Sequence, residues 1–388
     1  MRPHLRRLVL HRFRNIVPDT ELRFDPGVNV VLGKNASGKT TLLRVLEAVL
    51  SGRMQLLWDE QASVSAEFEV DGERTTVRYS SDPGSRTETL AVDAHRAGSR
   101  ASLSFEGDFA RLVVDGTEVS RSRHYKLEGN VRGAVSELAV RDWTALRPFD
   151  DQLVRFPEDL SHFDRVMRGE VRVSARPPGS FVTVVQSPTE WGSLLYREGH
   201  LIHPWHSLSD SAPRELVLVG TPIHDAAREM GFESAEVKLR AVDTGASPVV
   251  YGDLDVALQR RDGSWVRAEQ LSWGQKRLLS WWLVPAGRYW VSDELTNGLH
   301  HEWIERVLAR MGGHQAFLAT QNPLLLDHLE FGAADEVQRR IVACRTAQNG
   351  RERLAWTNPT REQAERFFTA YQVGIQHVSE LLRLEDLW

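Results

Sequence analysis

The segment "GKNASGKT" at residues 33–40 constrains the fold more than any other part of the sequence, because it satisfies the pattern G-x-x-x-x-G-K-[ST]. It follows an apolar run, "VNVVL", and precedes "TTLLRVLEAVL", whose apolar residues recur at helical spacing. In a strand, loop and helix of this kind, glycines let successive backbone N–H groups turn toward one anion. We therefore predict an α/β fold with a phosphate-binding loop; a plain glycine-rich turn is the alternative.

Each position of this phosphate loop, residues 33–40, has an expected task. Lys39 would neutralise the β- and γ-phosphate oxygens of a nucleotide, and the Thr40 hydroxyl would bind Mg²⁺. The other positions would approach the phosphates mainly through their backbone N–H groups. The predicted nucleotide-binding residues of this segment are Gly33, Asn35, Ala36, Ser37, Gly38, Lys39, Thr40 and Thr41.

A second motif, "YWVSDE" at residues 289–294, is an apolar run that ends in two carboxylates. Asp293 is expected to hold Mg²⁺ together with Thr40, and Glu294 to orient or deprotonate an attacking water. Acidic residues also follow many strands simply because a loop begins there. The phosphate loop earlier in the same chain favours the catalytic interpretation.

A third motif, "LSWGQKR" at residues 271–277, opens a run with helical spacing. Ser272 can cap this helix, while its hydroxyl and the Gly274 backbone N–H face an anion at the positive end of the helix. A simple helix cap is the alternative. Lys276 and Arg277 follow on the first turns; they could add positive potential at this end, but we expect both to be solvated.

The rest of the chain suggests one ATPase-like core that is interrupted by an insertion. Residues 62–120 alternate apolar and polar positions between glycine-bearing turns, which predicts antiparallel strands, whereas residues 134–170 have a mostly helical pattern. We expect three segments: 1–60, which carries the phosphate loop; 61–180, the β-rich and helical insertion; and 181–388, which carries the later motifs. No sustained heptad pattern predicts a long coiled coil.

Composition excludes several classes of protein. The formal net charge of −5 over 388 residues, with no basic block or tail, neither indicates nor excludes nucleic-acid binding. The single cysteine, Cys344, excludes an internal disulfide and any multi-cysteine metal site. Arginines interrupt the apolar residues at the amino terminus, and no apolar run reaches the ~20 residues of a membrane span. We therefore expect a cytoplasmic protein with no membrane partner.

Taken in order, the three motifs resemble the Walker A, signature and Walker B motifs of ABC-type ATPases. "TNGLH", which includes Asn297, resembles the D-loop that follows Walker B in these proteins. Within the superfamily, the amino-terminal segment "LRRLVLHRFRN" and the tail "TAYQVGIQHVSELLRLEDLW" are similar to the RecF, SMC and OLD group. The resemblance covers roughly residues 1–50 and 265–388, and it implies a two-lobed head domain of the ABC-ATPase fold.

The resemblance further implies ATP and Mg²⁺ as cofactors and a second copy of the chain as partner. In such a dimer each nucleotide lies between the phosphate loop of one copy and the signature helix of the other. Ser272, Gly274 and Asn297 would then contact the nucleotide bound by the other copy.

Three more residues gain expected roles only through this resemblance. Gln186, at the end of "FVTVVQ", matches the Q-loop glutamine that senses Mg²⁺ and the attacking water; an exposed loop glutamine is the alternative. Gln321 takes the place of the usual switch histidine. It can donate a hydrogen bond to the γ-phosphate but cannot become cationic, so hydrolysis should be slow or tied to a trigger. Arg14 matches an arginine that reaches the nucleotide, with a surface arginine as the alternative.

The expected function is therefore ATP binding and slow hydrolysis by a dimer that regulates or senses for a separate effector, such as a nuclease or toxin in bacterial antiphage defence. The effector role rests on analogy alone. One alternative is a RecF-like repair or replication ATPase that binds DNA directly, with Arg121, Arg123 and Arg132 as the candidate basic residues. Another is a scaffold that binds ATP without hydrolysing it, although Glu294 argues against this.

Overall fold

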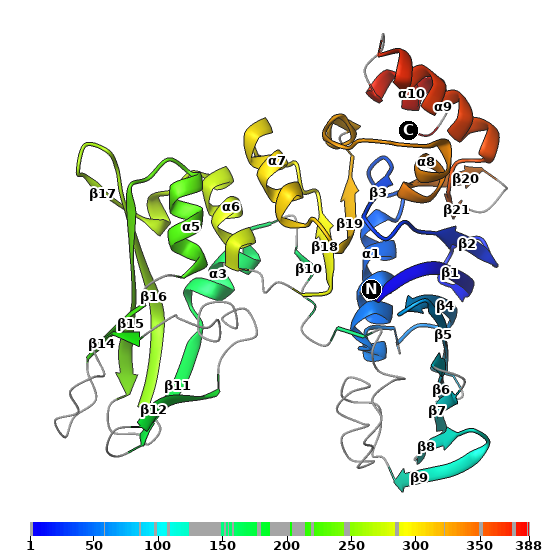
Figure 1. The fold of residues 1–388 in the computed structure, drawn as a ribbon, viewed down its shortest axis with the longest axis horizontal. Helices are drawn as coiled ribbons and strands as arrows, with labels where there is room; N and C mark the ends of the chain where they lie inside the picture. The colour runs from blue at the N-terminus through cyan, green and yellow to red at the C-terminus, as the bar shows by residue number, and fades with distance from the viewer. Residues whose placement is uncertain are drawn as a thin grey trace. The chain divides into compact units, whose positions relative to one another are not determined.

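The computed structural model of the chain divides into two compact units (Figure 1). Unit 1 comprises Met1–Arg155, Gly287–Leu295 and Leu308–Trp388, and unit 2 comprises Phe156–Ala286 and Thr296–Val307. The structure describes residues 3–57, 59–84, 87–96, 99–106, 109–123, 149–150, 153, 155–156, 159–176, 180–186, 202–203, 214–218, 221–243, 249–283, 287–321, 323–348, 352–374, 378–385 and 387.

The first sheet of unit 1 is an antiparallel sheet of eight strands in the order β2-β1-β4-β5-β6-β7-β8-β9. Its strands are β1 (His4–Phe13), β2 (Thr20–Arg23), β4 (Ala62–Val70), β5 (Glu73–Asp82), β6 (Thr87–Arg96), β7 (Ser99–Glu106), β8 (Phe109–Val114) and β9 (Thr117–Arg123). Buried and half-buried residues alternate along β4, as the period-two pattern predicts. The prediction of antiparallel strands in this segment is confirmed. Because β4 pairs with β1, these strands extend the amino-terminal sheet.

The second sheet of unit 1 has six strands in the order β10-β18-β19-β3-β20-β21. Its strands are β3 (Val28–Leu32), β10 (Arg155–Phe156), β18 (Tyr289–Asp293), β19 (Gln315–Thr320), β20 (Ile341–Gln348) and β21 (Glu352–Thr357). Strands β18, β19, β3 and β20 run parallel, and β21 returns antiparallel to β20. This sheet, with its helices and the two-unit division, confirms the predicted α/β class and the two-lobed phosphate-loop fold.

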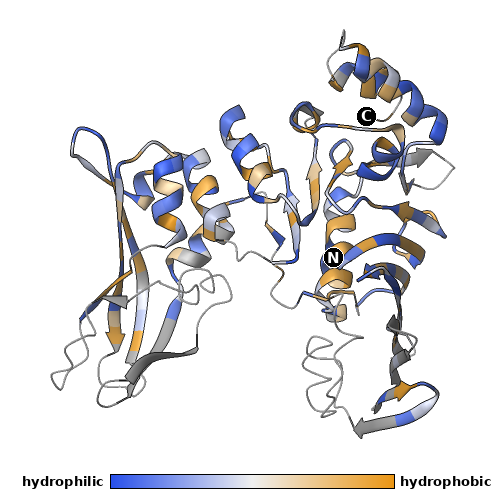
Figure 2. Ribbon diagram, in the orientation of Figure 1, coloured by the Kyte–Doolittle hydropathy of each residue, from blue (hydrophilic) through white to orange (hydrophobic). Residues whose placement is uncertain are grey.

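The helices of unit 1 are α1 (Lys39–Ser51), η1 (Met54–Leu56), η5 (Pro323–His328), α8 (Ala334–Arg340), α9 (Arg361–Val373) and α10 (Val378–Leu384). They reach this sheet through α1, which packs on β18 and β19, and α8, which packs on β3 and β20. The apolar face of α1 is buried in a core that also contains residues from both sheets (Figure 2). The longest helices in the described ranges, α1 and α9, have 13 residues each. No helix among the described residues is both long and apolar enough to cross a membrane.

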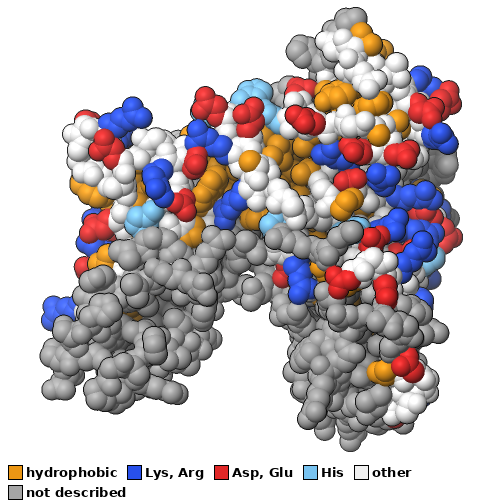
Figure 3. All heavy atoms as spheres, viewed as in Figure 1, with side chains coloured by type: hydrophobic (Ala, Val, Ile, Leu, Met, Phe, Trp, Pro, Cys, Tyr) orange, Lys and Arg blue, Asp and Glu red, His pale blue; other side chains and the backbone are white. Residues whose placement is uncertain are grey.

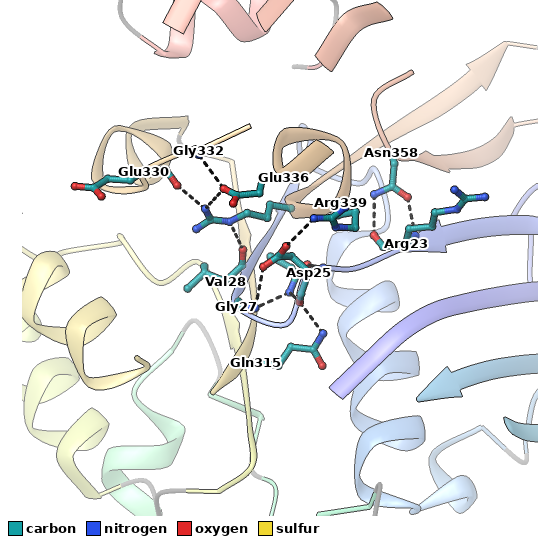
Figure 4. Close-up of polar contacts among 12 residues, drawn as sticks. Arg23, Asp25, Gly27, Val28, Gln315, Glu330, Gly332, Glu336, Arg339 and Asn358 are labelled. Atoms are coloured by element: carbon teal, nitrogen blue, oxygen red, sulfur yellow. Dashed lines mark hydrogen bonds and ion pairs between the residues drawn. The ribbon is translucent and has the colours of Figure 1, made fainter. Parts of the chain in front are cut away.

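The side-chain amide of Gln315 joins the two sheets of unit 1. Its Oε1 accepts a hydrogen bond from the Leu5 N–H at 2.8 Å, and its Nε2 donates to the Leu5 carbonyl at 2.7 Å. The same Nε2 donates to the Asp25 carbonyl at 2.8 Å (Figure 4). Gln315 is only 2% exposed, so these bonds satisfy backbone groups of β1 that would otherwise be buried without partners.

A network of polar contacts fixes the turn that leads into β3 (Figure 4). The buried Asn29 side chain donates to the Asp25 carbonyl at 2.9 Å, and the Asp25 carboxylate lies 3.6 Å from the Arg339 guanidinium of α8. Arg340 of the same helix donates to the Val28 carbonyl at 3.0 Å. These contacts fix the start of β3 and therefore the direction in which this strand runs into the phosphate loop.

Unit 2 is a mostly antiparallel sheet, in the order β12-β11-β16-β15-β14-β13 with β17 paired to β16, packed with helices. Its elements are α3 (Ser161–Met167), β11 (Glu170–Arg176), β12 (Ser180–Gln186), β13 (Ile202–His203), β14 (Glu215–Leu218), α5 (Pro222–Glu229), β15 (Ser234–Asp243), β16 (Val249–Gln259), β17 (Trp265–Arg267), η4 (Ala268–Gln270) and α6 (Trp273–Leu283). The helix α7 (His301–Arg310) begins in unit 2, and its last three residues belong to unit 1.

The two units follow other boundaries than the three predicted segments. Strands β4 to β9 belong to unit 1 through their pairing with β1, and β11 and β12 belong to unit 2 through their pairing with β16. The predicted insertion, residues 61–180, is thus shared between the units. Residues 124–148, where much of its helical pattern falls, lie outside the described residues, while α3 is helical as predicted.

Replacing Gln315 with leucine should lower the free energy of unfolding by about 3 kcal/mol, because both backbone groups of Leu5 lose their partner and the Asp25 carbonyl loses one of its two donors. Urea denaturation followed by circular dichroism measures this change. The matched control is Gln338→Leu, since the Gln338 amide makes one hydrogen bond, at 3.2 Å to the Pro359 carbonyl, from a half-buried position. Equal losses for the two variants would contradict the role assigned to Gln315.

Candidate functional site

The predicted site residues of unit 1 converge at one edge of the second sheet. Strands β18, β19 and β3 are neighbours and run parallel, so their carboxyl ends lie at the same edge. The phosphate loop follows β3, Glu294 follows β18, and Gln321 follows β19. Loops at the carboxyl edge of a parallel sheet are the usual place for ligand binding in α/β folds.

The phosphate loop curls around the ammonium group of Lys39. Its Nζ donates to the Gly33 carbonyl at 2.8 Å and to the Lys34 carbonyl at 3.3 Å, and the residue is 7% exposed. Two positive φ angles, 62° at Ala36 and 89° at Gly38, produce the reversal of the backbone. The loop thus brings a buried cation and the amino-terminal end of α1 together, which is an arrangement suited to an anion.

The structure brings together Thr40 and Asp293, the two residues predicted to hold Mg²⁺. The Thr40 hydroxyl donates to Oδ2 of Asp293 at 2.7 Å, although 253 positions separate them. A hydroxyl and a carboxylate are ligands that Mg²⁺ accepts, with phosphate and water oxygens completing its octahedral shell. Within the described part of the chain, no group of three or more His, Cys, Asp or Glu residues could hold a metal alone. The donor set therefore fits a Mg²⁺ that arrives with a phosphate ligand.

Glu294 lies at the centre of the site. It is 6% exposed, and its Oε1 lies 3.6 Å from the Lys39 Nζ. Both carboxylate oxygens accept from the Gln321 backbone N–H at 3.1 Å, and Oε2 lies 3.4 Å from the Thr320 hydroxyl. The φ angle of Glu294 is 47°, a left-handed conformation that non-glycine residues rarely adopt. The strand end therefore turns sharply and presents this carboxylate to the phosphate loop.

Other predicted residues of unit 1 occupy the edges of the site. Gln321 contacts Glu294 through its backbone, and its side chain is exposed. Arg14, with a φ angle of 46°, donates from Nε to Glu60 Oε1 at 2.9 Å, and its guanidinium carbon lies 5.5 Å from the centre of the Phe13 ring. Asn35 and Ala36 are exposed and Thr41 is half-buried. The nucleotide contacts of these residues stay predictions.

The signature segment, residues 271–277, lies in unit 2, where Ser272 caps α6. The Gln275 backbone N–H donates to the Ser272 hydroxyl at 3.3 Å, and the Gln275 side chain accepts from the Ser272 N–H at 3.0 Å. This reciprocal pair is a capping box. The cap interpretation is therefore observed directly, and the exposed Ser272 lies at the positive end of the helix.

The turn that contains Asn297 packs directly on the start of α6. A Cβ on Gly274 would lie 2.2 Å from the Gly298 carbonyl, and a Cβ on Gly298, whose φ angle is 71°, would lie 2.3 Å from the Trp273 ring. Only glycines allow this approach. Asn297 itself is exposed, so unit 2 presents Ser272 and Asn297 on segments that touch each other.

The expectation that Lys276 and Arg277 are both solvated is wrong for Arg277. Arg277 is 0% exposed, and its guanidinium carbon lies 5.3 Å from the ring centres of both Phe156 and Trp273. Arg277 falls on the buried stripe of α6, three residues after Gly274, so helical spacing overrides its charge. Lys276 is half-buried, with its Nζ 5.7 Å from the Phe163 ring centre.

Gln186 ends β12 in unit 2, where its backbone is paired with Arg172. Its side chain is outside the described part of the structure, so its predicted roles in catalysis and Mg²⁺ binding stay predictions.

Sequence reasoning missed three residues behind the phosphate loop: Cys344 of β20 and Leu354 and Trp356 of β21. Trp356 donates from Nε1 to the Ser37 carbonyl at 3.2 Å. Burial raises the pKa of the Cys344 thiol to about 12, which leaves the thiol protonated and unreactive at neutral pH. No local pattern links residues 341–357 to a loop some 300 positions earlier, so no sequence signal could have revealed the contact.

The amino-terminal part of the chain matches a known family. Residues 7–132 match the family model described as an AAA domain. The DNA replication and repair protein RecF of Psychromonas ingrahamii is 51% identical over 49 residues, which cover 13% of each protein. RecF of Listeria welshimeri is 57% identical over 47 residues, or 12% of each. The amino-terminal part of the chain is therefore similar to an AAA domain and to the matching part of RecF proteins.

The sequence matches span only 12–13% of the length of these RecF relatives. Among solved structures, the SMC head domain of Thermotoga maritima covers 92% of this chain at 13% identity, with a TM-score of 0.41. This chain matches 99% of that structure. An Smc head domain of Pyrococcus furiosus, solved bound to the C-terminal domain of ScpA, covers 95% at 10% identity, with a TM-score of 0.47. The match spans 100% of that chain. At this level of similarity, the site is best judged from its own geometry.

Proposed function

We propose that this chain binds ATP with Mg²⁺ and hydrolyses it slowly to ADP and phosphate. The observation that carries the proposal is the convergence of Lys39, Thr40, Asp293 and Glu294 at one sheet edge, although the two motifs are some 250 positions apart. A buried ammonium, a hydroxyl–carboxylate pair and a second carboxylate are the groups that phosphoryl transfer to water requires.

The geometry suggests a task for each group in hydrolysis. Lys39 would exchange its contacts with the Gly33 and Lys34 carbonyls for phosphate oxygens of ATP. Thr40 and Asp293 would hold Mg²⁺, which offsets the charge of the phosphates. Glu294 would accept a proton from a water that attacks the γ-phosphorus, while the bond from that phosphorus to the bridging oxygen of the β-phosphate breaks.

The slow rate follows from Gln321. Its side chain is exposed at the end of β19 and can donate a hydrogen bond to the γ-phosphate. It carries no positive charge with which to offset the charge that develops during transfer. Hydrolysis should therefore be slow, or depend on a trigger that supplies this missing stabilisation.

We further propose that two copies close around ATP, with Ser272, Gly274 and Asn297 of one copy facing the nucleotide on the other. Support comes from the exposure of Ser272 and Asn297 and from the close packing of Gly274 on Gly298, which joins their two segments. A dimer of this kind is symmetric, so it contains two equivalent shared sites.

The proposed biological role is regulation or sensing for a separate effector, such as a nuclease or toxin in bacterial antiphage defence. This step rests on analogy with stand-alone ATPases of the same group, and a non-hydrolysing scaffold is disfavoured by the buried Glu294 beside Lys39. Identifying the protein that co-purifies with the full chain tests it directly. Recovery of the ATPase alone, under conditions that preserve complexes, would count against an effector.

A second candidate is a RecF-like ATPase that binds DNA directly, which the local identity to RecF proteins favours. Over β1 and β2, basic and acidic side chains are intermixed (Figure 3), and Arg7 pairs with both Glu21 and Glu67 at 2.7 Å. Such pairing reduces the attraction of this surface for phosphates. ATP-dependent DNA binding that weakens steeply with salt concentration would favour this candidate over effector control.

Lys39→Ala should reduce ATP affinity at least about a hundredfold, because a buried cation that contacts the phosphates is lost. Glu294→Gln should retain ATP binding, lower kcat by a factor of about 10²–10⁴ and accumulate an ATP-bound dimer. Calorimetry measures the ATP affinity, phosphate release measures kcat, and light scattering detects the dimer. Lys238→Ala and Glu302→Gln, which replace surface charges of unit 2, are the matched controls. Hydrolysis at the normal rate by Glu294→Gln would exclude Glu294 as the base.

Mixing two inactive variants tests the shared site. A Lys39→Ala chain lacks the phosphate-loop cation, and a Ser272→Arg chain places a bulky side chain where the other copy must approach. Random pairing makes half the dimers mixed, each with one intact site, so the mixture should recover about a quarter of the wild-type activity. Phosphate release measures the recovery, with each variant alone as the control. If the mixture stays inactive, the two copies do not share sites in this way.

A further inference from the structure

The β20–β21 hairpin covers one side of the phosphate loop, which we call its back. The opposite side, where a phosphate would bind, is its front. Strand β20 pairs in parallel with β3, with Ala343 opposite Leu32, so the hairpin continues alongside the point where β3 enters the loop. Strand β21 returns antiparallel to β20, which brings Leu354 and Trp356 to the same region.

The hairpin contacts both glycines of the loop. A Cβ on Gly33 would lie 2.5 Å from the Cys344 carbonyl, and a Cβ on Gly38 would lie 2.6 Å from Leu354 Cδ1 and 3.1 Å from Trp356 Nε1. Both positions must therefore be glycine for a steric reason that comes from the hairpin. Gly38 also needs its φ angle of 89°.

One hydrogen bond fixes the orientation of a peptide group in the loop. Trp356, which is 1% exposed, donates from Nε1 to the carbonyl of Ser37 at 3.2 Å. The peptide bond between Ser37 and Gly38 is planar and trans, so its N–H points opposite to its carbonyl. Because the carbonyl is held at the back of the loop, the Gly38 N–H is directed to the front, where a phosphate would bind.

The same strand also holds the turn that carries Arg14. The Leu354 N–H donates to the Asn15 carbonyl at 3.0 Å, and the Val17 N–H donates to the Leu354 carbonyl at 2.9 Å. Leu354 thus contacts the Arg14 turn through its backbone and the phosphate loop through its side chain. A single residue of β21 sets the positions of two segments that were predicted to reach the nucleotide.

We propose that Trp356 is a positioning residue for nucleotide binding, which acts by aiming the Gly38 N–H at the phosphates. This inference rests on the proposed ATP-binding function. Without the indole N–H, the peptide group would populate other orientations, and the apparent affinity for nucleotide would fall with the population of the competent one. The chemistry itself would be unchanged in the loops that remain competent.

The test compares Trp356→Phe, which keeps a buried ring but loses the N–H, with wild type in the full chain. The dissociation constant of Mg²⁺-ADP, measured by calorimetry, should rise about two- to tenfold, the value expected for one hydrogen bond. The KM for ATP should rise by a similar factor while kcat changes less than about twofold. A purely structural role would instead lower the active fraction, and therefore kcat, with KM unchanged.

Trp290→Phe is the matched control. Trp290 is 3% exposed in the same unit, and its ring packs against the Arg310 guanidinium, 5.6 Å from the ring centre. Side chains alternate along β18, so Trp290 lies on the face opposite Asp293. Its replacement should cost comparable stability and leave the ADP dissociation constant unchanged.

The outcomes separate this inference from the proposed function. Failure of the wild-type chain to bind ADP or ATP would overturn the proposed function itself. Normal binding by Trp356→Phe, or equal weakening in Trp290→Phe, would overturn the role of Trp356 alone. If Trp356→Phe does not fold, Trp356→Met removes the same indole N–H with a flexible apolar side chain and should raise the ADP dissociation constant in the same way; unchanged binding would again contradict the proposal.

Discussion

The structure of unit 1 depends on the side-chain amide of Gln315, which makes the two hydrogen bonds to β1 that a neighbouring strand would otherwise make. The Gln315 amide satisfies both backbone groups of Leu5, which would otherwise face an apolar core without partners. It thereby fixes β1 of the first sheet against β19 of the second. Since β19 lies between β3 and β18, its position also sets the spacing between the phosphate loop and Glu294. A buried contact at the start of β19 therefore helps to fix the geometry of the candidate site at the other end of the strand.

Charge balance explains why the site can remain buried. Lys39 and Glu294 are each less than a tenth exposed and lie 3.6 Å apart, so each compensates the cost of burying the other. Backbone carbonyls and an N–H complete the hydrogen bonds of the pair.

The sequence predicted those parts of the site that are encoded in local patterns. Glycine spacing predicts the turn of the phosphate loop, the acidic end of an apolar run predicts that Asp293 lies near Thr40, and alternation predicts the strands of the first sheet. The structure has all three features. Arg277 was mispredicted because its charge was weighed above its place on a buried helix stripe. The contact of Trp356 with the phosphate loop could not be predicted from the sequence. It depends on the pairing of strands that are distant from the loop in sequence, and no local pattern indicates that pairing.

The capping box at Ser272 has a consequence for how two copies could meet. A hydroxyl has one proton to donate and two lone pairs to accept with, and the cap uses only a lone pair, through the Gln275 N–H. The proton of Ser272 stays available for an oxygen that approaches from outside. The Ser272 hydroxyl could therefore cap α6 and also donate to a nucleotide on another copy. The cap would also fix the direction in which that proton can point.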